Sequence, residues 1–288
     1  MSWVGEATGL WGALSKGWGW WRGRRDPARH SALRLIRAFE AHGVVRQQIV
    51  RLVPAAIAQA RPELGMADCS SPEQLKPKLT PALLDWAAGH VNLRRDWLDG
   101  RDVPPHLVVD HYKHPACYGP WLQQRKTAVP EAHRCLTVLK THGVPVGPGA
   151  DGPLCLVYEE TTEGLDGMEW SRYWLLADHW HMGHAPCLEN LAAVVHVAQQ
   201  AGVLVVGREL KARDLLRLQE GQALVPEVLG RVQGSWYPGD LVDPPPQHDS
   251  VWRKAIWQGA QGWLAQPGPP NGITGCNTGS GAASQAGQ

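Results

Sequence analysis

The sequence predicts an α+β fold in which an N-terminal all-α module is followed by a mixed α/β module. Three observations lead to this prediction. Apolar residues recur at helical spacing through residues 31–100, strand-like and helix-like runs share residues 104–236, and the net charge changes sign between the two parts. Residues 1–100 carry 14 basic and 9 acidic side chains, whereas residues 101–288 carry 14 and 18. We therefore expect the two parts to have different partners.

The chain begins with a Trp-, Gly- and Arg-rich extension, residues 1–30. Five of the 15 tryptophans fall within the first 21 residues, and the apolar side chains there follow helical spacing. Five interspersed glycines weaken an isolated helix. We expect residues 3–21 to become ordered by docking, either on protein or, as a peripheral anchor, on a membrane surface.

The helical module, residues 31–100, is divided by capping residues and turn signals. Ser31 is a suitable N-cap, Gly43 a suitable C-terminal stop, and the Thr80-Pro81 pair places proline at the first position of a helix. The predicted segments are a helix from Ser31 to Gly43, helices over 46–53 and 55–61, a loop over 62–78, a helix from Thr80 to Val91 and a last turn over 93–98.

The α/β module, residues 104–236, combines short apolar runs rich in β-branched residues with longer runs of helical period. The predicted strands cover residues 107–112, 154–159, 173–178 and 203–207. The predicted helices cover residues 115–126, 131–142, 186–201 and 210–219.

Two further segments complete the chain. Residues 237–264 contain a proline-rich linker with Pro244, Pro245 and Pro246, followed by an amphipathic helix on which Trp252 and Ile256 share a face. Residues 265–288 hold mainly Gly, Pro, Ser, Ala, Asn and Gln, which predicts a disordered tail.

Composition excludes several classes of protein. No apolar run reaches the roughly 18 to 20 residues that span a bilayer, and the basic residues at the start follow the apolar stretch, unlike those of a secretory signal. The six cysteines are scattered without a Cys-x-x-Cys pair, which predicts reduced thiols instead of a disulfide framework. We expect a cytoplasmic protein.

Residues 33–100 resemble the lambda-repressor-like, or Xre-class, helix-turn-helix family. The resemblance rests on three stretches: Leu33-Arg34-Leu35-Ile36-Arg37 leading to His42-Gly43-Val44, then Arg46-Gln47-Gln48-Ile49, and the block from Thr80 to Gly100. It implies a DNA-binding domain with a recognition helix after the second helix. In this sequence that place is taken by the alanine-rich residues 54–62, which depart from the family pattern.

The resemblance places candidate DNA contacts on the second helix, the recognition segment and the closing turn. Polar readers of base edges are confined to Gln59 and Arg61. The other candidates would contact phosphates. The complete predicted set is Arg46, Gln47, Gln48, Arg51, Gln59, Arg61, Arg94 and Arg95. The alternative is a helical scaffold without base readout that serves protein contacts.

A second constellation lies at His179, His181, His184 and Cys187. Residues 179 and 181 of a strand point to the same side, and imidazole and thiolate are ligands that zinc accepts. The spacing matches no standard zinc module, and 13 histidines in 288 residues also cluster by chance. A zinc-dependent sensor is therefore an alternative hypothesis, and no other cofactor is implied.

Enzyme signatures are missing from the sequence. It has no Gly-x-Ser-x-Gly elbow and no Gly-x-x-x-x-Gly-Lys phosphate loop, and the glycine-rich residues 143–149 contain prolines where backbone N–H groups would be needed. The acidic run from Glu159 and Glu160 to Glu169 is predicted to be a solvated turn. We expect no catalytic activity.

Together these features predict a transcription regulator of bacterial type that binds DNA as a homodimer, with its α/β module sensing a ligand or mediating association. The main alternative is a protein-interaction or membrane-peripheral protein held by its Trp-rich extension. The sequence leaves the operator and the ligand open.

Overall fold

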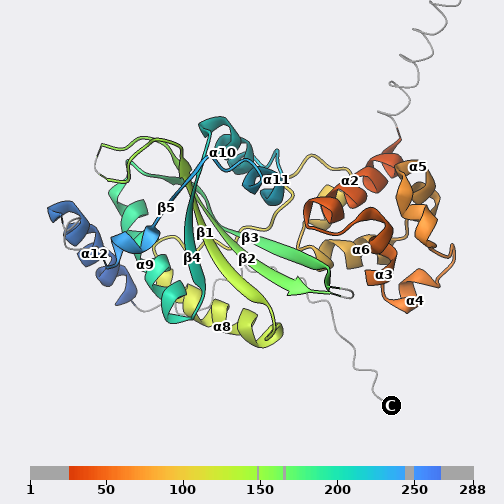
Figure 1. Ribbon diagram of the computed structural model, residues 1–288, viewed down its shortest axis with the longest axis horizontal. Helices are drawn as coiled ribbons and strands as arrows, with labels where there is room; N and C mark the ends of the chain where they lie inside the picture. Colours follow the sequence, from red (N-terminus) through yellow and green to blue (C-terminus); the bar gives the residue numbers. More distant parts are fainter. Residues whose placement is uncertain (1–25, 148, 165–166, 244–249, 267–288) are drawn as a thin grey trace, which may run out of the picture. The chain divides into compact units, whose positions relative to one another are not determined.

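The computed structural model describes residues 26–147, 149–164, 167–243 and 250–266, and there the fold is α+β, as predicted (Figure 1). The chain divides into two units. The first takes residues 26–40, 44–88 and 94–103, and the second takes residues 41–43, 89–93 and the described residues from 104 onward. No helix in the described ranges combines the length and the apolar character that a bilayer crossing requires.

Helix α2 (Pro27–Ala41) begins earlier than predicted. The Asp26 carboxylate accepts a hydrogen bond from the backbone N–H of Arg29 at 3.0 Å, so Asp26 provides a partner for one of the free N–H groups in the first turn. Ser31, the predicted cap, lies buried inside the helix. The helix buries Leu35, Ile36 and Phe39 at helical spacing, as the apolar pattern indicated.

Several short helices make up the rest of the first unit. The predicted loop over residues 62–78 is wrong, because Ser71 caps a short helix there and Leu75 is fully buried. The Thr80-Pro81 start is confirmed, with Thr80 accepting the backbone N–H of Leu83 at 3.1 Å. In order, the elements are η1 (Arg46–Gln48), α3 (Ile49–Leu52), α4 (Ala55–Ala58), η2 (Met66–Ser70), α5 (Pro72–Leu75), η3 (Lys76–Lys78), α6 (Pro81–His90) and α7 (Arg95–Leu98).

The second unit is built on a five-stranded mixed sheet of order β3-β2-β1-β4-β5. Strand β1 is central, antiparallel to β2 and parallel to β4, while β3 and β5 pair antiparallel at the two outer positions. The strands are β1 (His133–Thr141), β2 (Pro153–Glu163), β3 (Glu169–His181), β4 (Leu204–Leu210) and β5 (Gly234–Trp236).

The predicted helix over residues 131–142 is wrong, because this segment forms β1. Five consecutive residues, 136–140, are buried, since helices cover both faces of the sheet. A strand buried on both sides loses its two-residue alternation and cannot be told from a buried helix by period. The predicted strand over residues 107–112 is reduced to one isolated bridge, Val108 to Leu175.

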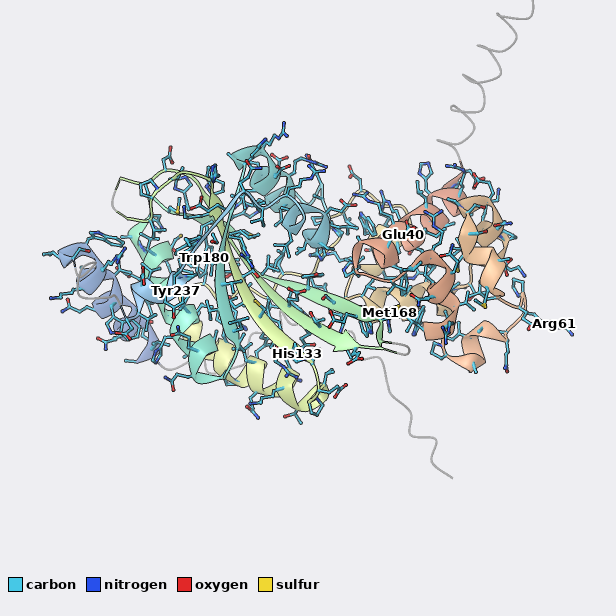
Figure 2. The ribbon with its side chains drawn as sticks, in the orientation of Figure 1. Glu40, Arg61, His133, Met168, Trp180 and Tyr237 are labelled. Carbon is cyan, nitrogen blue, oxygen red and sulfur yellow. The ribbon has the colours of Figure 1, made fainter. Side chains whose placement is uncertain are left out.

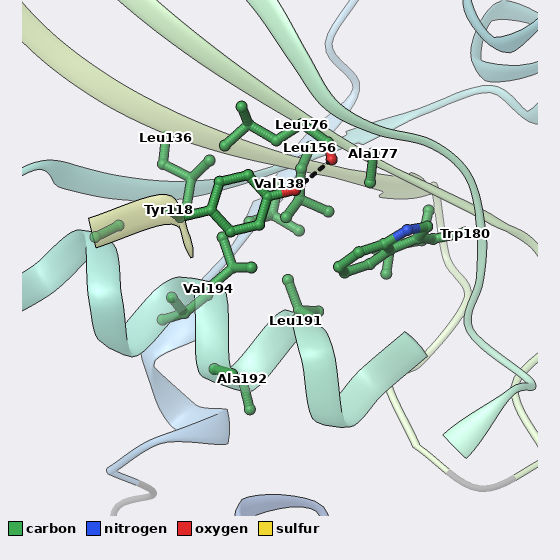
Figure 3. Packing of buried hydrophobic residues seen from close by; sticks show 14 of the residues in the cluster. Tyr118, Leu136, Val138, Leu156, Leu176, Ala177, Trp180, Leu191, Ala192 and Val194 are labelled. Atoms are coloured by element: carbon green, nitrogen blue, oxygen red, sulfur yellow. Dashed lines mark hydrogen bonds between the residues drawn. The ribbon is translucent and has the colours of Figure 1, made fainter. Parts of the chain in front are cut away.

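Helices cover the two faces of the sheet (Figure 1). Helices α8 (Tyr118–Ala128) and α9 (Ala185–Gln200) pack on one face, and α10 (Ala212–Gln219) and α11 (Val225–Leu229) pack on the other. Figure 3 shows Tyr118 on the first face, wedged between α9 and the sheet, where its hydroxyl donates to the Leu176 carbonyl at 2.7 Å.

The C-terminal helix α12 (Val251–Leu264) packs on α9, with Ile256 and Ala260 buried in the same core. The amphipathic helix predicted within residues 237–264 is therefore present, but it is part of the second unit. The proline-containing segment before it is also partly in the core, because Pro238 begins η6 (Pro238–Leu241) and is buried. The predicted 1–30 extension and 265–288 tail lie almost wholly outside the described residues.

Candidate functional site

The predicted DNA contacts on the second helix differ in their surroundings. Arg46, in η1, forms a bidentate ion pair with Glu40 at 2.8 and 3.0 Å and also donates to the Ser70 carbonyl. Its charge is therefore compensated within the unit. Gln47 is exposed and Gln48 is half-buried at the junction with α3, while Arg51 is exposed on α3.

The recognition segment forms a shorter helix than predicted. Residues 55–61 were expected to be helical, whereas α4 ends at Ala58 and Gln59 is its C-cap. Gln59 and Arg61 are both exposed, and Arg61 makes no hydrogen bond or ion pair to any described residue. Figure 2 shows the Arg61 side chain extending outward from the first unit.

The two arginines of the closing turn also occupy different environments. Arg94 is the half-buried N-cap residue of α7. Arg95, in α7, pairs with Asp85 at 2.9 Å and with Asp99.

Residues 26–100 carry ten basic and eight acidic side chains, so most of the +5 of residues 1–100 belongs to the first 25 residues, outside the described part. The described first unit has only a modest electrostatic attraction for phosphate.

The predicted metal ligands do not converge on one point. Within the described ranges, no three His, Cys, Asp or Glu side chains are arranged to hold a metal ion. His179 is exposed on β3, and His181 turns toward Asp151, with 3.0 Å between Nε2 and the carboxylate. Only His184 and Cys187 come together, so these observations give the zinc hypothesis no support.

His184 and Cys187 form a small polar cluster with Tyr112, a residue the sequence analysis missed. The Nδ1 atom of His184 lies 3.3 Å from the Tyr112 hydroxyl and 3.3 Å from Cys187 Sγ. His184 is the N-cap residue of α9, and Cys187 lies in the first turn. Burial and the neighbouring Cys187 raise the pKa of the Tyr112 hydroxyl to about 12, so it stays protonated as a donor.

A buried asparagine positions the loop that carries Tyr112. Asn190, on α9, is fully buried, accepts the backbone N–H of Lys113 at 2.8 Å and donates to the Pro186 carbonyl. Trp180 packs against the Tyr112 ring, with 5.5 Å between centroids. Cys187 lies beside the His184 imidazole at the start of α9. Cys187 is nevertheless buried, at 6% exposure, which restricts the access of a reactant.

A second polar cluster joins the ends of the parallel strands β1 and β4. Lys140 is opposite Glu209 in the register and contacts its carboxylate at 2.5 Å, while His142 Nδ1 lies 2.8 Å from the other carboxylate oxygen. Burial opposes ionisation of Glu209, but hydrogen bonds from Lys140, the Gly143 backbone and His142 hold its pKa below the usual range. Glu209 thus orients an imidazole that is half exposed.

Both clusters lie at one edge of the sheet, because β1, β3 and β4 all run in the same direction. The carboxyl ends of parallel strands are a common place for ligand sites. Proximity in sequence indicated His184 with Cys187. Nothing in the sequence linked Lys140 or His142 to Glu209, since that pair requires the β1 strand, which was predicted to be helical.

Comparison of the chain with protein-family models, curated proteins and solved structures finds no match.

Proposed function

We propose that this chain is a DNA-binding regulatory protein, in which the first unit contacts DNA and the second unit serves ligand sensing or association. The exposed corner formed by α3 and α4 carries the proposal. Val53 is buried between the two helices, whereas residues 54–56 and 59–61 face solvent. The small side chains of Ala55 and Ala56 let a DNA backbone approach this corner closely.

Two side chains at this corner have the chemistry that DNA contacts need. Arg61 supplies an exposed cation that no described carboxylate compensates. Gln59 supplies an amide that can donate to and accept from a base edge. Arg46 and Arg95 would first have to leave their carboxylates, so we expect them to contribute little.

The proposal predicts weak, salt-sensitive binding. Each neutralised phosphate contributes about −0.9 to the slope of log K against log salt concentration. If Arg61 of both protomers in the proposed homodimer contacts DNA, the described units supply a slope of roughly −2. Arg22, Arg24 and Arg25 in the N-terminal extension would make the slope steeper.

The test measures binding of the full chain to a fluorescent duplex of mixed sequence by anisotropy, between about 50 and 200 mM salt. Arg61→Glu should weaken binding and flatten the slope. Arg46→Gln should leave the slope nearly unchanged, because Arg46 is already paired. Arg208→Glu, an exposed change on β4, is the matched control for net charge.

Two outcomes would contradict the proposal. One is the absence of duplex binding by the full chain at about 50 mM salt. The other is binding that R61E leaves intact while the triple change R22Q/R24Q/R25Q removes it. In that case the N-terminal extension binds polyanions in general, and the α3–α4 corner has no part in DNA recognition.

A further inference from the structure

Three strands of the second unit place charged residues in a single row. Arg134 of β1 is opposite Glu160 of β2, and Glu160 is opposite Arg172 of β3. Directly opposed residues of antiparallel strands project from the same face of the sheet. Arg125, from α8, completes the group from above with a bidentate pair to Glu160 at 3.0 and 2.6 Å. We call these four residues the arginine row.

The acidic residue of the arginine row, Glu160, already has close hydrogen-bond partners. Glu160, predicted to lie in a solvated turn, has no exposed surface. Its carboxylate accepts both Arg125 hydrogen bonds and a third from the Tyr158 hydroxyl at 3.2 Å. Arg172 reaches it only at 3.5 Å. The buried Glu160 carboxylate thus faces three guanidinium groups, and Glu131 adds a second negative charge near Arg172, which leaves one positive charge in excess.

Two of the three arginines, Arg134 and Arg172, lack partners for part of their hydrogen-bonding capacity. Arg134 donates to two backbone carbonyls, of Val129 and Ala132, and Arg172 stacks on the Trp170 ring at 5.3 Å. The Nε atoms of both arginines are buried and have no hydrogen-bond partner among the described residues. Burial also lowers the pKa of Arg172, and the charges of Glu160 and Glu131 only partly oppose this effect.

A third unsatisfied group lies beside the row. Thr162 follows Glu160 by two positions on β2, so its side chain projects from the same face, diagonal to Arg172. Its Oγ1 atom is buried and likewise has no partner in the described ranges. Three unsatisfied polar atoms therefore occur at neighbouring positions of three adjacent strands. Such atoms are rare in folded proteins and call for an explanation.

We propose that the arginine row binds the oxyanion of a small ligand, a phosphate or carboxylate group, through Arg134, Arg172 and Thr162. An oxyanion accepts several charge-assisted hydrogen bonds at once and would offset the excess charge. Solvent reaches the row at Arg172, whose side chain is 17% exposed. That this ligand is the one sensed by the second unit rests on the proposed function; the site itself does not.

Calorimetry of the full chain with inorganic phosphate, and separately with succinate, tests the site and distinguishes its two ligand classes. We expect at least one of them to bind with a dissociation constant below about 10 mM. Arg172→Gln should weaken that binding about tenfold or more, since it removes a charged donor. Arg208→Gln, on the exposed surface of β4, is the matched control and should leave the affinity unchanged.

Thr162→Val guards against an unfolded variant, because it keeps the side-chain shape and removes only the hydroxyl. It should weaken binding several-fold with an unaltered circular dichroism spectrum. The site is refuted if neither anion binds below about 10 mM, or if R172Q and T162V bind as tightly as the unmodified chain. Duplex binding is measured separately and reports on the proposed function. If the full chain binds the anion but binds no duplex, the proposed function is overturned and the anion site is still supported.

Discussion

The Arg125 guanidinium and the Glu160 carboxylate form a bidentate pair at 3.0 and 2.6 Å, and Glu160 has no exposed surface. Arg125 also stacks on the Trp174 ring, with 4.4 Å to its centroid. Removing Arg125 takes away both of its short charge-assisted hydrogen bonds and leaves the buried Glu160 carboxylate with the Tyr158 hydroxyl at 3.2 Å and Arg172 at 3.5 Å. Arg125→Met should therefore lower the free energy of unfolding by about 3 kcal/mol in urea titrations.

Combining Arg125→Met with Glu160→Gln separates this charge penalty from lost packing. The double variant should recover part of the stability, because no buried carboxylate is left without its main partner. A double variant whose loss equals the sum of the two single losses would show that the pair is not coupled. Unfolding followed by circular dichroism measures all three variants.

Stability should fall in mild acid because two histidines, the buried His106 and the half-buried His90, resist protonation. Burial, with the nearby charges of Arg172 and His42, lowers the pKa of His90 to about 4. Burial also places the pKa of His106 well below its usual value, and His106 Nε2 accepts the Val225 N–H at 2.9 Å. Both histidines are thus neutral in the folded protein at pH 6.

The direction of this pH dependence follows from which state, folded or unfolded, binds protons at the higher pH. Histidines of the unfolded chain take up protons near pH 6.5, whereas folded His90 does so only near pH 4, so stability falls as the pH drops through this window. His90 alone accounts for about 3 kcal/mol. His90→Phe keeps a ring against Trp170, which His90 stacks on at 4.1 Å, and should flatten the dependence. An identical pH profile for H90F would refute this role.

The sequence predicted those elements whose signals are local. The Thr80-Pro81 start of α6 and the helix α9 were correct to within a residue or two, because caps and amphipathic faces are set by residues three or four apart. Strand β1 was missed for the opposite reason. Its five buried residues in a row are explained only by helices that come from distant parts of the chain.

The same distinction holds for the candidate sites. His184 and Cys187 are three residues apart, and their pairing could be anticipated from sequence. The arginine row could not, because Arg134, Glu160 and Arg172 meet only through the registers of two strand pairs. The acidic run around Glu160 looked like a solvated turn, since its cationic partners lie 12 to 35 positions away.

A substitution at Gly207 tests how closely β4 and β5 pack against each other. It is opposite Trp236 in the register, and an added Cβ would lie 2.5 Å from the Trp236 carbonyl oxygen and 2.6 Å from two atoms of its indole ring. A backbone atom at that distance cannot move aside without breaking the ladder. Gly207→Ala should therefore destabilise the protein by about 3 kcal/mol, at the upper end for an overpacked site.

Gly262 provides the matched control. It lies within α12 with nothing within 4 Å of its added Cβ, so Gly262→Ala should gain about 0.5 to 1 kcal/mol from helix propensity. The two variants make the same chemical change and should shift the urea midpoint in opposite directions. Hydrogen exchange at β5 amides would reveal a local release of that strand. If G207A leaves both the urea midpoint and the hydrogen-exchange protection of β5 unchanged, Gly207 does not approach Trp236 as closely as described.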